Sequence, residues 1–192
     1  SSCVTDSGVA ANTCNGNGDG MIRSKVSNGT YEDIRAWQHL SLAGIVPGNY
    51  TGLVPTGATG KRYYEAGVNI PDSYVTGGTH WLLNCCMGNS HYGKEAHNLI
   101  TYSGQTPGST TIINSGILTP KNAKAIDTKI DDGLASKGKL FAFEGNPQLQ
   151  NGTRCVDAYY QDIDPNTGER VLDVNYVLSD TDTSCRLFYY LD

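Results

Sequence analysis

The sequence lacks three features that would place it in a common functional class. Basic residues are few, since 14 Lys and Arg face 19 Asp and Glu, which gives a formal net charge of −5 at pH 7. That balance, with no Lys/Arg cluster, excludes the electrostatic footprint of a nucleic-acid-binding protein. Apolar runs are too short to span a bilayer as a helix. Charged residues make up only 17% of the chain, which argues against a disordered tail or a coiled coil.

Recognisable catalytic signatures are also missing. The sequence contains no Gly-x-Ser-x-Gly elbow, no His-Glu-x-x-His motif and no phosphate-binding loop. The pair Asp131-Asp132 stands directly before Gly133, at the expected end of a helix. We interpret this pair as a solvated helix terminus rather than as an acid/base pair. We therefore expect that the protein is not an enzyme.

Glycine and tyrosine are abundant, with 23 and 12 residues. Glycine at about 12% exceeds a typical usage of about 7%, which predicts long loops and many turns. Tyrosine suits exposed β-structure, because its ring packs while its hydroxyl stays in water. A chain of 192 residues fits a single globular domain, which we place at residues 1–192.

Six cysteines indicate an oxidising compartment and a disulfide-stapled fold: Cys3, Cys14, Cys85, Cys86, Cys155 and Cys185. Six cysteines allow 15 complete pairings. A Cys3–Cys14 bond would close a short loop, and a Cys155–Cys185 bond would clamp a C-terminal hairpin. A bond between the adjacent Cys85 and Cys86 would be strained, so each of the two could reach another partner.

Two helices are expected. The first covers residues 30–44, with Thr30 as its N-cap and an apolar stripe that includes Ile34, Trp37 and Leu42. The second covers residues 119–133. Thr119 serves as its N-cap and Pro120 occupies its first turn, where a missing N–H costs nothing. Its expected buried face is Ala123, Ile126 and Ile130.

Short strands account for most of the remaining periodicity. We expect strands at residues 67–70, 80–85, 99–102, 110–113, 138–143, 154–163, 170–178 and 184–191. The last three follow one another with short links, which predicts an antiparallel meander. The fold class is therefore α+β, with helices packed on an antiparallel sheet and long glycine-rich loops.

Two loops have the alternating oxygen ligands of a calcium site. The first holds Asn15, Asn17 and Asp19, followed by Gly20, although Val26 stands where an EF-hand has its bidentate glutamate. The alternative for this loop is a turn that binds nothing. The second holds Asp162, Asp164 and Asn166. Because it lies at an expected hairpin tip, we favour an ordinary turn there.

Three segments together resemble a known family. They are residues 15–22 (NGNGDGMI), residues 32–52 with their WQHLSLAGIVPGNYTG stretch, and residues 118–139 (LTPKNAKAIDTKIDDGLASKGK) with the ending DTSCRLFYYLD at 182–192. These segments are similar to the globular heads of bacterial type IV pilin-like proteins, which are made with a prepilin-type leader. Type II secretion pseudopilins belong to the same superfamily.

The resemblance implies a pilin-like head without its N-terminal apolar helix. In such proteins that helix sits in the inner membrane before assembly and bundles in the filament core afterwards. The chain opens at Ser1 rather than at Met, and we expect that a preceding segment has been removed. The head would face the periplasm and then the cell exterior, where Cys155–Cys185 would form a C-terminal staple.

The expected function is that of a structural subunit, major or minor, of a type IV pilus-like or pseudopilus filament. Its partners would be other pilin subunits, the inner membrane through the missing helix, and a host or surface receptor. The alternative is a secreted calcium-dependent adhesin or glycan-binding module, which the exposed tyrosines such as Tyr63 and Tyr64 would suit. A secreted hydrolase with an unrecognised site is a third hypothesis.

Overall fold

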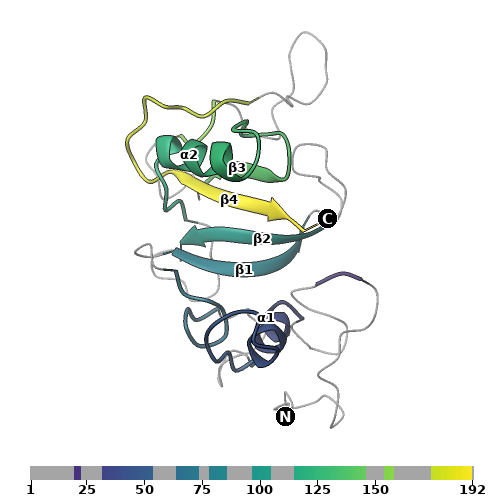
Figure 1. Ribbon diagram of the computed structural model, residues 1–192. Coiled ribbons are helices and arrows are strands. Elements are labelled where there is room, and N and C mark those ends of the chain that lie inside the picture. Colours follow the sequence, from purple (N-terminus) through teal and green to yellow (C-terminus); the bar gives the residue numbers. More distant parts are fainter. Residues whose placement is uncertain are drawn as a thin grey trace.

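Six elements form the framework of the chain (Figure 1). They are α1 (Glu32–Leu42), β1 (Gly78–Cys85), β2 (His97–Gly104), α2 (Pro120–Ile130), β3 (Leu140–Glu144) and β4 (Cys185–Tyr190). The computed structural model describes residues 20–22, 32–53, 64–73, 78–85, 97–104, 115–145, 154–157 and 174–191, with the backbone alone at 78–85 and 97.

Helix α1 forms where the sequence predicted it. Ile34 and Trp37 are buried against Tyr50 and Tyr64, in an N-terminal cluster that also contains Ile70. The expected stripe is one residue too long, because Leu42 is 58% exposed at the end of the helix. The expected N-cap, Thr30, lies outside the described residues.

Helix α2 confirms the predicted N-terminal signals. The Thr119 hydroxyl accepts a hydrogen bond from the Asn122 N–H at 3.3 Å, and Pro120 occupies the first turn. Ala123 is fully buried and Ile126 is partly buried against the core. The prediction for Ile130 is wrong, since this residue is 57% exposed. It shares the angular position of Ala123 but is the last residue of the helix.

Four strands form one antiparallel sheet in the order β1-β2-β4-β3. The register pairs Leu82 of β1 with Ile100 of β2, and Ile100 with Tyr189 of β4. Helix α1 contacts β1, whereas α2 contacts β3 and β4. The two helices therefore lie against opposite ends of the sheet (Figure 1). The expected strands at 80–85, 99–102, 138–143 and 184–191 correspond to β1, β2, β3 and β4.

The predicted C-terminal meander is wrong in the placement of its third strand. The described parts of its first two strands do pair: an antiparallel bridge joins Val156 to Tyr176, flanked by main-chain hydrogen bonds from the Asp157 N–H to the Asn175 carbonyl at 3.0 Å and from the Val177 N–H to the Cys155 carbonyl at 2.9 Å. Residues 158–163 and 170–173 of these strands lie outside the described residues. Strand β4 does not extend a hairpin but lies between β2 and β3. Its CRLFYY sequence explains this position, because four of its residues are buried and the other two are half-buried. A strand that is apolar on both faces is stabilised inside a covered sheet rather than at its edge.

The expected strand at 67–70 is a turn instead. The Glu65 carbonyl accepts hydrogen bonds from the N–H groups of Val68 and Asn69. The fully buried Asn69 side chain accepts from the Glu65 N–H at 2.8 Å and donates to the Leu53 carbonyl at 3.2 Å. An asparagine side chain that satisfies nearby main-chain groups favours a turn over a strand. The expected strand at 110–113 lies outside the described residues.

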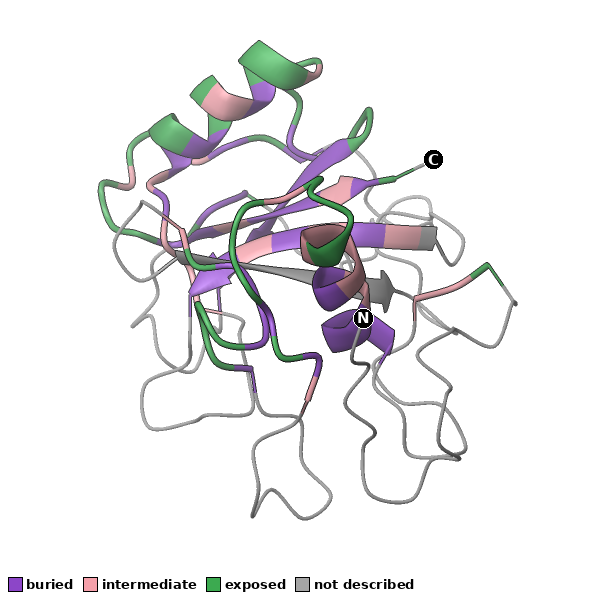
Figure 2. Cartoon of the chain, turned by 60° about the horizontal axis from the view of Figure 1, so that its bottom comes forward, coloured by how far each residue is buried: buried purple, intermediate pink, exposed green. Residues whose placement is uncertain are grey.

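The main core surrounds β3, β4 and α2. Its buried residues include Leu99, Phe141, Phe143, Leu187 and Phe188, and the disulfide half-cystines belong to it. Figure 2 shows buried residues on the strands and on the inner side of α2, with exposed residues on the outer side of that helix. The described architecture is thus α+β, with both helices packed on an antiparallel sheet.

In the part of the chain that the structure describes, neither helix has the length and apolar character needed to cross a membrane.

Candidate functional site: the tethered C-terminal segment and its acidic loop

A disulfide links Cys155 to Cys185, as one of the pairings allowed by the sequence. Both residues are fully buried. Cys185 is the first residue of β4, and its register partner on β3 is Glu144. The bond therefore fastens Cys155 to β4, an inner strand of the sheet. Cys3, Cys14 and Cys86, and the side chain of Cys85, lie outside the described residues.

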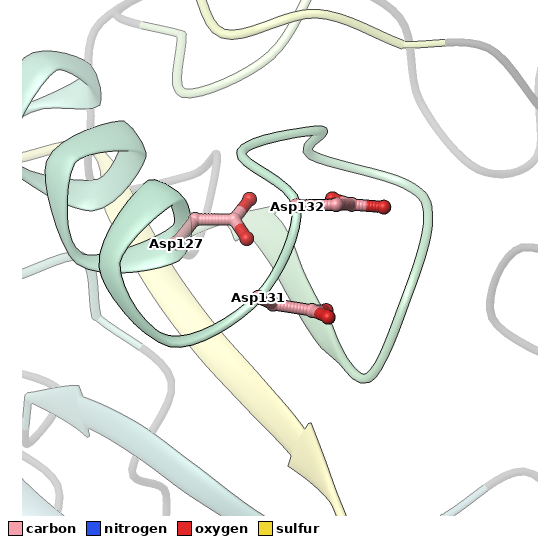
Figure 3. A group of neighbouring side chains, drawn as sticks. All are labelled: Asp127, Asp131 and Asp132. Carbon is pink, nitrogen blue, oxygen red and sulfur yellow. The ribbon is translucent and has the colours of Figure 1, made fainter.

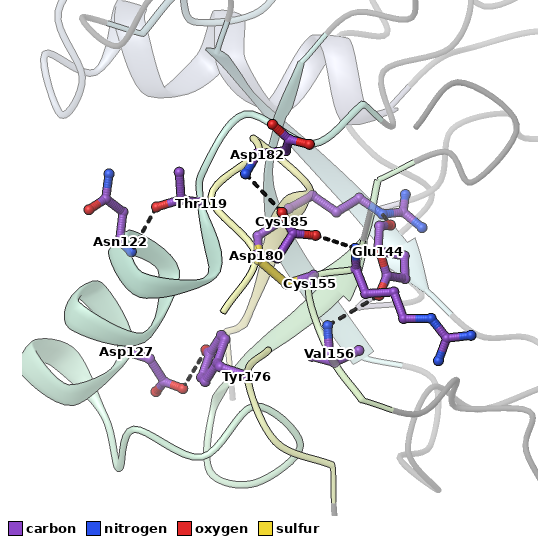
Figure 4. The surroundings of a disulfide bond; sticks show 12 residues. Thr119, Asn122, Asp127, Glu144, Cys155, Val156, Tyr176, Asp180, Asp182 and Cys185 are labelled. Atoms are coloured by element: carbon purple, nitrogen blue, oxygen red, sulfur yellow. Dashed lines mark hydrogen bonds between the residues drawn. A yellow bond between two sulfur atoms is a disulfide. The ribbon is translucent and has the colours of Figure 1, made fainter. Parts of the chain in front are cut away.

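A buried carboxylate holds the chain beside the disulfide. Glu144 is 7% exposed, and its Oε1 accepts a hydrogen bond from the Val156 N–H at 3.1 Å (Figure 4). The Cys155 N–H donates to the same carboxylate. On the other side, the Arg154 N–H donates to Asp180 Oδ2 at 2.6 Å. Residues 154–156 are thus fixed by carboxylates from β3 and from the segment that leads into β4.

A second tether joins the C-terminal segment to α2. The Tyr176 hydroxyl donates to Asp127 Oδ2 at 2.7 Å, and Asp127 is fully buried (Figure 4). The Val174 N–H donates to the Ser136 hydroxyl oxygen at 3.2 Å. Because Tyr176 also forms a bridge with Val156, the two tethers hold the same pair of short segments. The described residues 154–157 and 174–180 are thus held to the core by the disulfide and by two buried carboxylates.

Both buried carboxylates have perturbed protonation. Burial raises the pKa of Asp127, and nearby Asp132 and Asp131 raise it further, while the bonds from Tyr176 and Gly133 oppose the shift. Burial also raises the pKa of Glu144, against the opposing effects of the Cys155 and Val156 N–H groups and of Arg154. The shared cause is the loss of water around the ionised form.

Three aspartates gather at the end of α2. Carboxylate oxygens of Asp127, Asp131 and Asp132 lie within 4.8 Å of one another (Figure 3). Main-chain donors serve all three, since Gly133 N–H binds Asp127 at 3.2 Å, Leu140 N–H binds Asp131 at 2.8 Å and Leu134 N–H binds Asp132 at 2.8 Å. These hydrogen bonds explain why the three carboxylates lie together, since they fix the path of residues 131–139, which we call the edge loop.

The interpretation of Asp131-Asp132 as a solvated terminus is therefore incomplete. Asp131 is the C-cap of α2, and its N–H donates to the Asp127 carbonyl at 2.7 Å. Its carboxylate also accepts the N–H groups of Lys139 and Leu140, eight and nine residues further on. Two glycines permit this path: Gly133 has φ +76° and Gly138 has φ +70°, both in the left-handed region. A Cβ on Gly138 would also clash with the Asp131 carboxylate.

A separate polar network supports α1. The expectation that Tyr64 is exposed is wrong, because this residue packs in the N-terminal cluster and is only 4% exposed. Its hydroxyl donates to Asp33 Oδ2 at 2.5 Å, and Asp33 is 1% exposed. Arg35 donates to Gln38 Oε1 at 3.0 Å, and Gln38 donates to the Thr51 carbonyl at 2.8 Å. The network thus joins α1 to the loops at 51 and 64 through side chains that are almost wholly buried.

Both candidate calcium loops lie outside the described residues. Asn15, Asn17 and Asp19 precede the described residues 20–22, and Asp162, Asp164 and Asn166 lie between the described segments 154–157 and 174–191. Among the described residues, the group of acidic oxygen atoms that lie together belongs to Asp127, Asp131 and Asp132.

Sequence reasoning missed Asp127, Glu144 and Tyr176. One signal was available for Asp127, which lies four residues after the buried Ala123 on the inner face of α2. An acid on the apolar face of a helix indicates a buried carboxylate with a partner. No comparable local signal marks Glu144, because its partners lie at Cys155 and Val156, a separate part of the chain.

The chain matches no family model, no curated protein and no solved structure.

Proposed function

We propose that this chain is the globular head of a structural subunit in a type IV pilus-like or type II secretion pseudopilus filament. In this proposal an N-terminal apolar helix of the full gene product anchors the subunit in the inner membrane and then packs in the filament core. The head performs no catalysis and presents a durable surface outside the cell. Assembly would be driven by burial of the apolar helices against one another.

The observation that carries the proposal is the C-terminal segment closed by Cys155–Cys185 onto an antiparallel sheet. A disulfide restricts the unfolded chain, which favours persistence in an oxidising exterior. Both buried ends of that bond lie in the main core. A subunit exposed on a filament would benefit from such an attachment, in which residues 154–157 and 174–180 are held to the core without a ligand.

The segments that carry the family resemblance also support the proposal. Residues 32–52 contain α1, residues 118–139 contain α2 and the edge loop, and residues 182–192 contain β4. These are the two helices and an inner strand of the sheet. The resemblance therefore concerns residues that build the framework, rather than surface positions whose agreement would mean little.

The test is the N-terminus and intact mass of the native protein, isolated from the membranes of its source. We expect an additional apolar helix that begins with a processed, N-methylated residue, and immunogold labelling of filaments with antibodies against the head. A mature chain that begins near Ser1 and is found free in the medium would contradict the proposal. Calcium-dependent binding on a glycan array by that free form would favour the alternative of a secreted adhesin.

A further inference from the structure

Strand β3 is an outer strand of the sheet and has an aggregation-prone sequence. It lies at one end of the order β1-β2-β4-β3, and all five residues of its LFAFE sequence are buried. An outer strand presents a row of main-chain N–H and C=O groups that can pair with another strand. Short apolar strands without proline are the segments most prone to such pairing.

The alternation of main-chain groups shows which side of β3 faces outward. The Lys139 carbonyl accepts from the Tyr190 N–H at 2.9 Å, and the Gly145 N–H donates to the Ser184 carbonyl at 2.7 Å. Odd-numbered residues therefore point their main-chain groups inward, toward β4. Because successive residues of a strand alternate, the N–H groups of Leu140 and Ala142 point away from the sheet.

By the same alternation the Glu144 N–H also points outward, and the edge loop occupies the first two of these three groups. The Leu140 N–H donates to Asp131 Oδ2 at 2.8 Å, and the Ala142 N–H donates to the Ala135 carbonyl at 2.9 Å. Ala135 is 1% exposed, so the loop packs against the core rather than hanging free. The loop is not itself a strand, so within the described chain it ends the sheet instead of extending it.

We propose that the edge loop is an autoinhibitory contact that keeps β3 from pairing with β3 of a second copy of this chain. Two identical antiparallel edges are self-complementary, since each offers the other the same N–H and C=O groups, and they form a closed two-fold contact. The Asp131 carboxylate acts as the latch, because it takes the first outward N–H of the strand. This inference does not depend on the filament proposal.

The test compares the full chain with Asp131→Ala, Asp131→Asn and Asp132→Ala. Asp131→Ala removes the acceptor, Asp131→Asn keeps an oxygen acceptor, and Asp132→Ala removes a neighbouring carboxylate that binds only within the loop, at the Leu134 N–H. Association is measured by light scattering after size exclusion over a wide concentration range. We expect at least about tenfold tighter self-association for Asp131→Ala, little change for Asp132→Ala and an intermediate result for Asp131→Asn.

Hydrogen exchange at Leu140 and Ala142 separates edge pairing from unspecific aggregation. In dilute Asp131→Ala these amides should exchange faster than in the wild type, and they should regain protection as the variant associates. A folded Asp131→Ala that stays monomeric with fast exchange would overturn the proposal, as would association that leaves both amides unprotected.

If Asp131→Ala does not fold, Gly138→Ala, whose Cβ displaces the same carboxylate, is tested in its place. Failure of both variants to fold would make the loop part of the folding core and would also overturn the proposal.

Discussion

At the scale of single residues, two buried carboxylates attach the C-terminal segment to the framework. Glu144 and Asp127 each accept donors from the C-terminal segment, yet burial raises the pKa of both. The donors therefore reduce the cost of burying an ionised group without cancelling it. This balance has a definite consequence for the dependence of stability on pH.

The first prediction concerns Glu144→Gln. Because the folded-state pKa of Glu144 lies above its ordinary value of 4.5, the native state binds this proton more tightly than the unfolded state. Its contribution to stability is present below pH 4.5 and is lost as pH rises through the folded-state pKa, at about 1.4 kcal/mol for each unit between the two values. Urea unfolding at a series of pH values should show this decline in the wild type and a flatter profile in Glu144→Gln.

Glu65→Gln is the matched control for that profile, because Glu65 is an exposed glutamate in a different part of the chain, beside the turn at 65–70. It should keep the wild-type dependence on pH in the same window. If the Glu144→Gln profile instead ran parallel to that of the wild type, the pKa of Glu144 would be the same in the folded and unfolded states, which would contradict the prediction. The absolute stability of the variant is not the criterion, because an amide changes the hydrogen bonds as well as the charge.

The second prediction concerns the bond between Tyr176 and Asp127. Tyr176→Phe removes a donor from a buried carboxylate, and hydrogen bonds to charged groups contribute about 1.5–3 kcal/mol. We expect urea unfolding at neutral pH to show a loss of about 2 kcal/mol. Tyr102→Phe is the control, because its hydroxyl bonds the neutral Ser73 hydroxyl in a half-buried setting. Equal losses in the two variants would argue against a special role for the Asp127 tether.

At the scale of elements, α2 illustrates how local signals begin a helix. Thr119 lies in extended conformation, with φ −69° and ψ 154°, and caps the Asn122 N–H. Thr119→Ala should lower the free energy of unfolding by about 1 kcal/mol, while Thr119→Ser should retain most of the stability because it keeps the hydroxyl. Thermal and urea unfolding of the three proteins provide the measurement. Identical losses for alanine and serine would assign the effect to the lost methyl group.

The end of α2 depends on residues that lie further along the chain. Its C-cap, Asp131, is positioned by N–H groups at Lys139 and Leu140. Gly133 was correctly expected near the end of the helix, but the edge loop that follows also needs Gly138 and the outer edge of β3. Local sequence signals therefore place α2, whereas the path of the edge loop that follows it depends on hydrogen bonds with the start of β3.

At the scale of the whole molecule, the disulfide is the long-range constraint on the C-terminal segment. Cys155 and Cys185 are separated by 30 residues, and closing a loop of this length stabilises the folded state by about 3–4 kcal/mol in the chain-entropy description. The double variant Cys155→Ala/Cys185→Ala should lose about that much in urea unfolding. The oxidised wild-type protein, measured under the same conditions, serves as the comparison. A loss well under about 1 kcal/mol would indicate that the carboxylate tethers order the segment without the bond.

Much of the framework could be predicted from local sequence. Both helices, the four strands of the sheet and the α+β class follow from periodicity, capping residues and alternation. The failures have particular causes. The Asn69 side chain bonds nearby main-chain groups and so favours a turn where a strand was expected. Ile130 is exposed at the last position of α2, where the helical periodicity continues but the packing does not. The third strand of the expected meander, β4, lies between β2 and β3 instead, because alternation indicates a strand but does not identify its neighbour.

The sequence by itself determined where α1, α2 and the four strands form, because those choices depend on residues within a few positions of one another. It also restricted Cys155 and Cys185 to a small set of pairings. Only the tertiary structure decided that β4 lies between β2 and β3, and that Glu144 and Asp127 tether the C-terminal segment. The physical reason is range: a hydrogen bond between residues 49 positions apart, as between Asp127 and Tyr176, leaves no periodic trace in the sequence and exists only once the chain is packed.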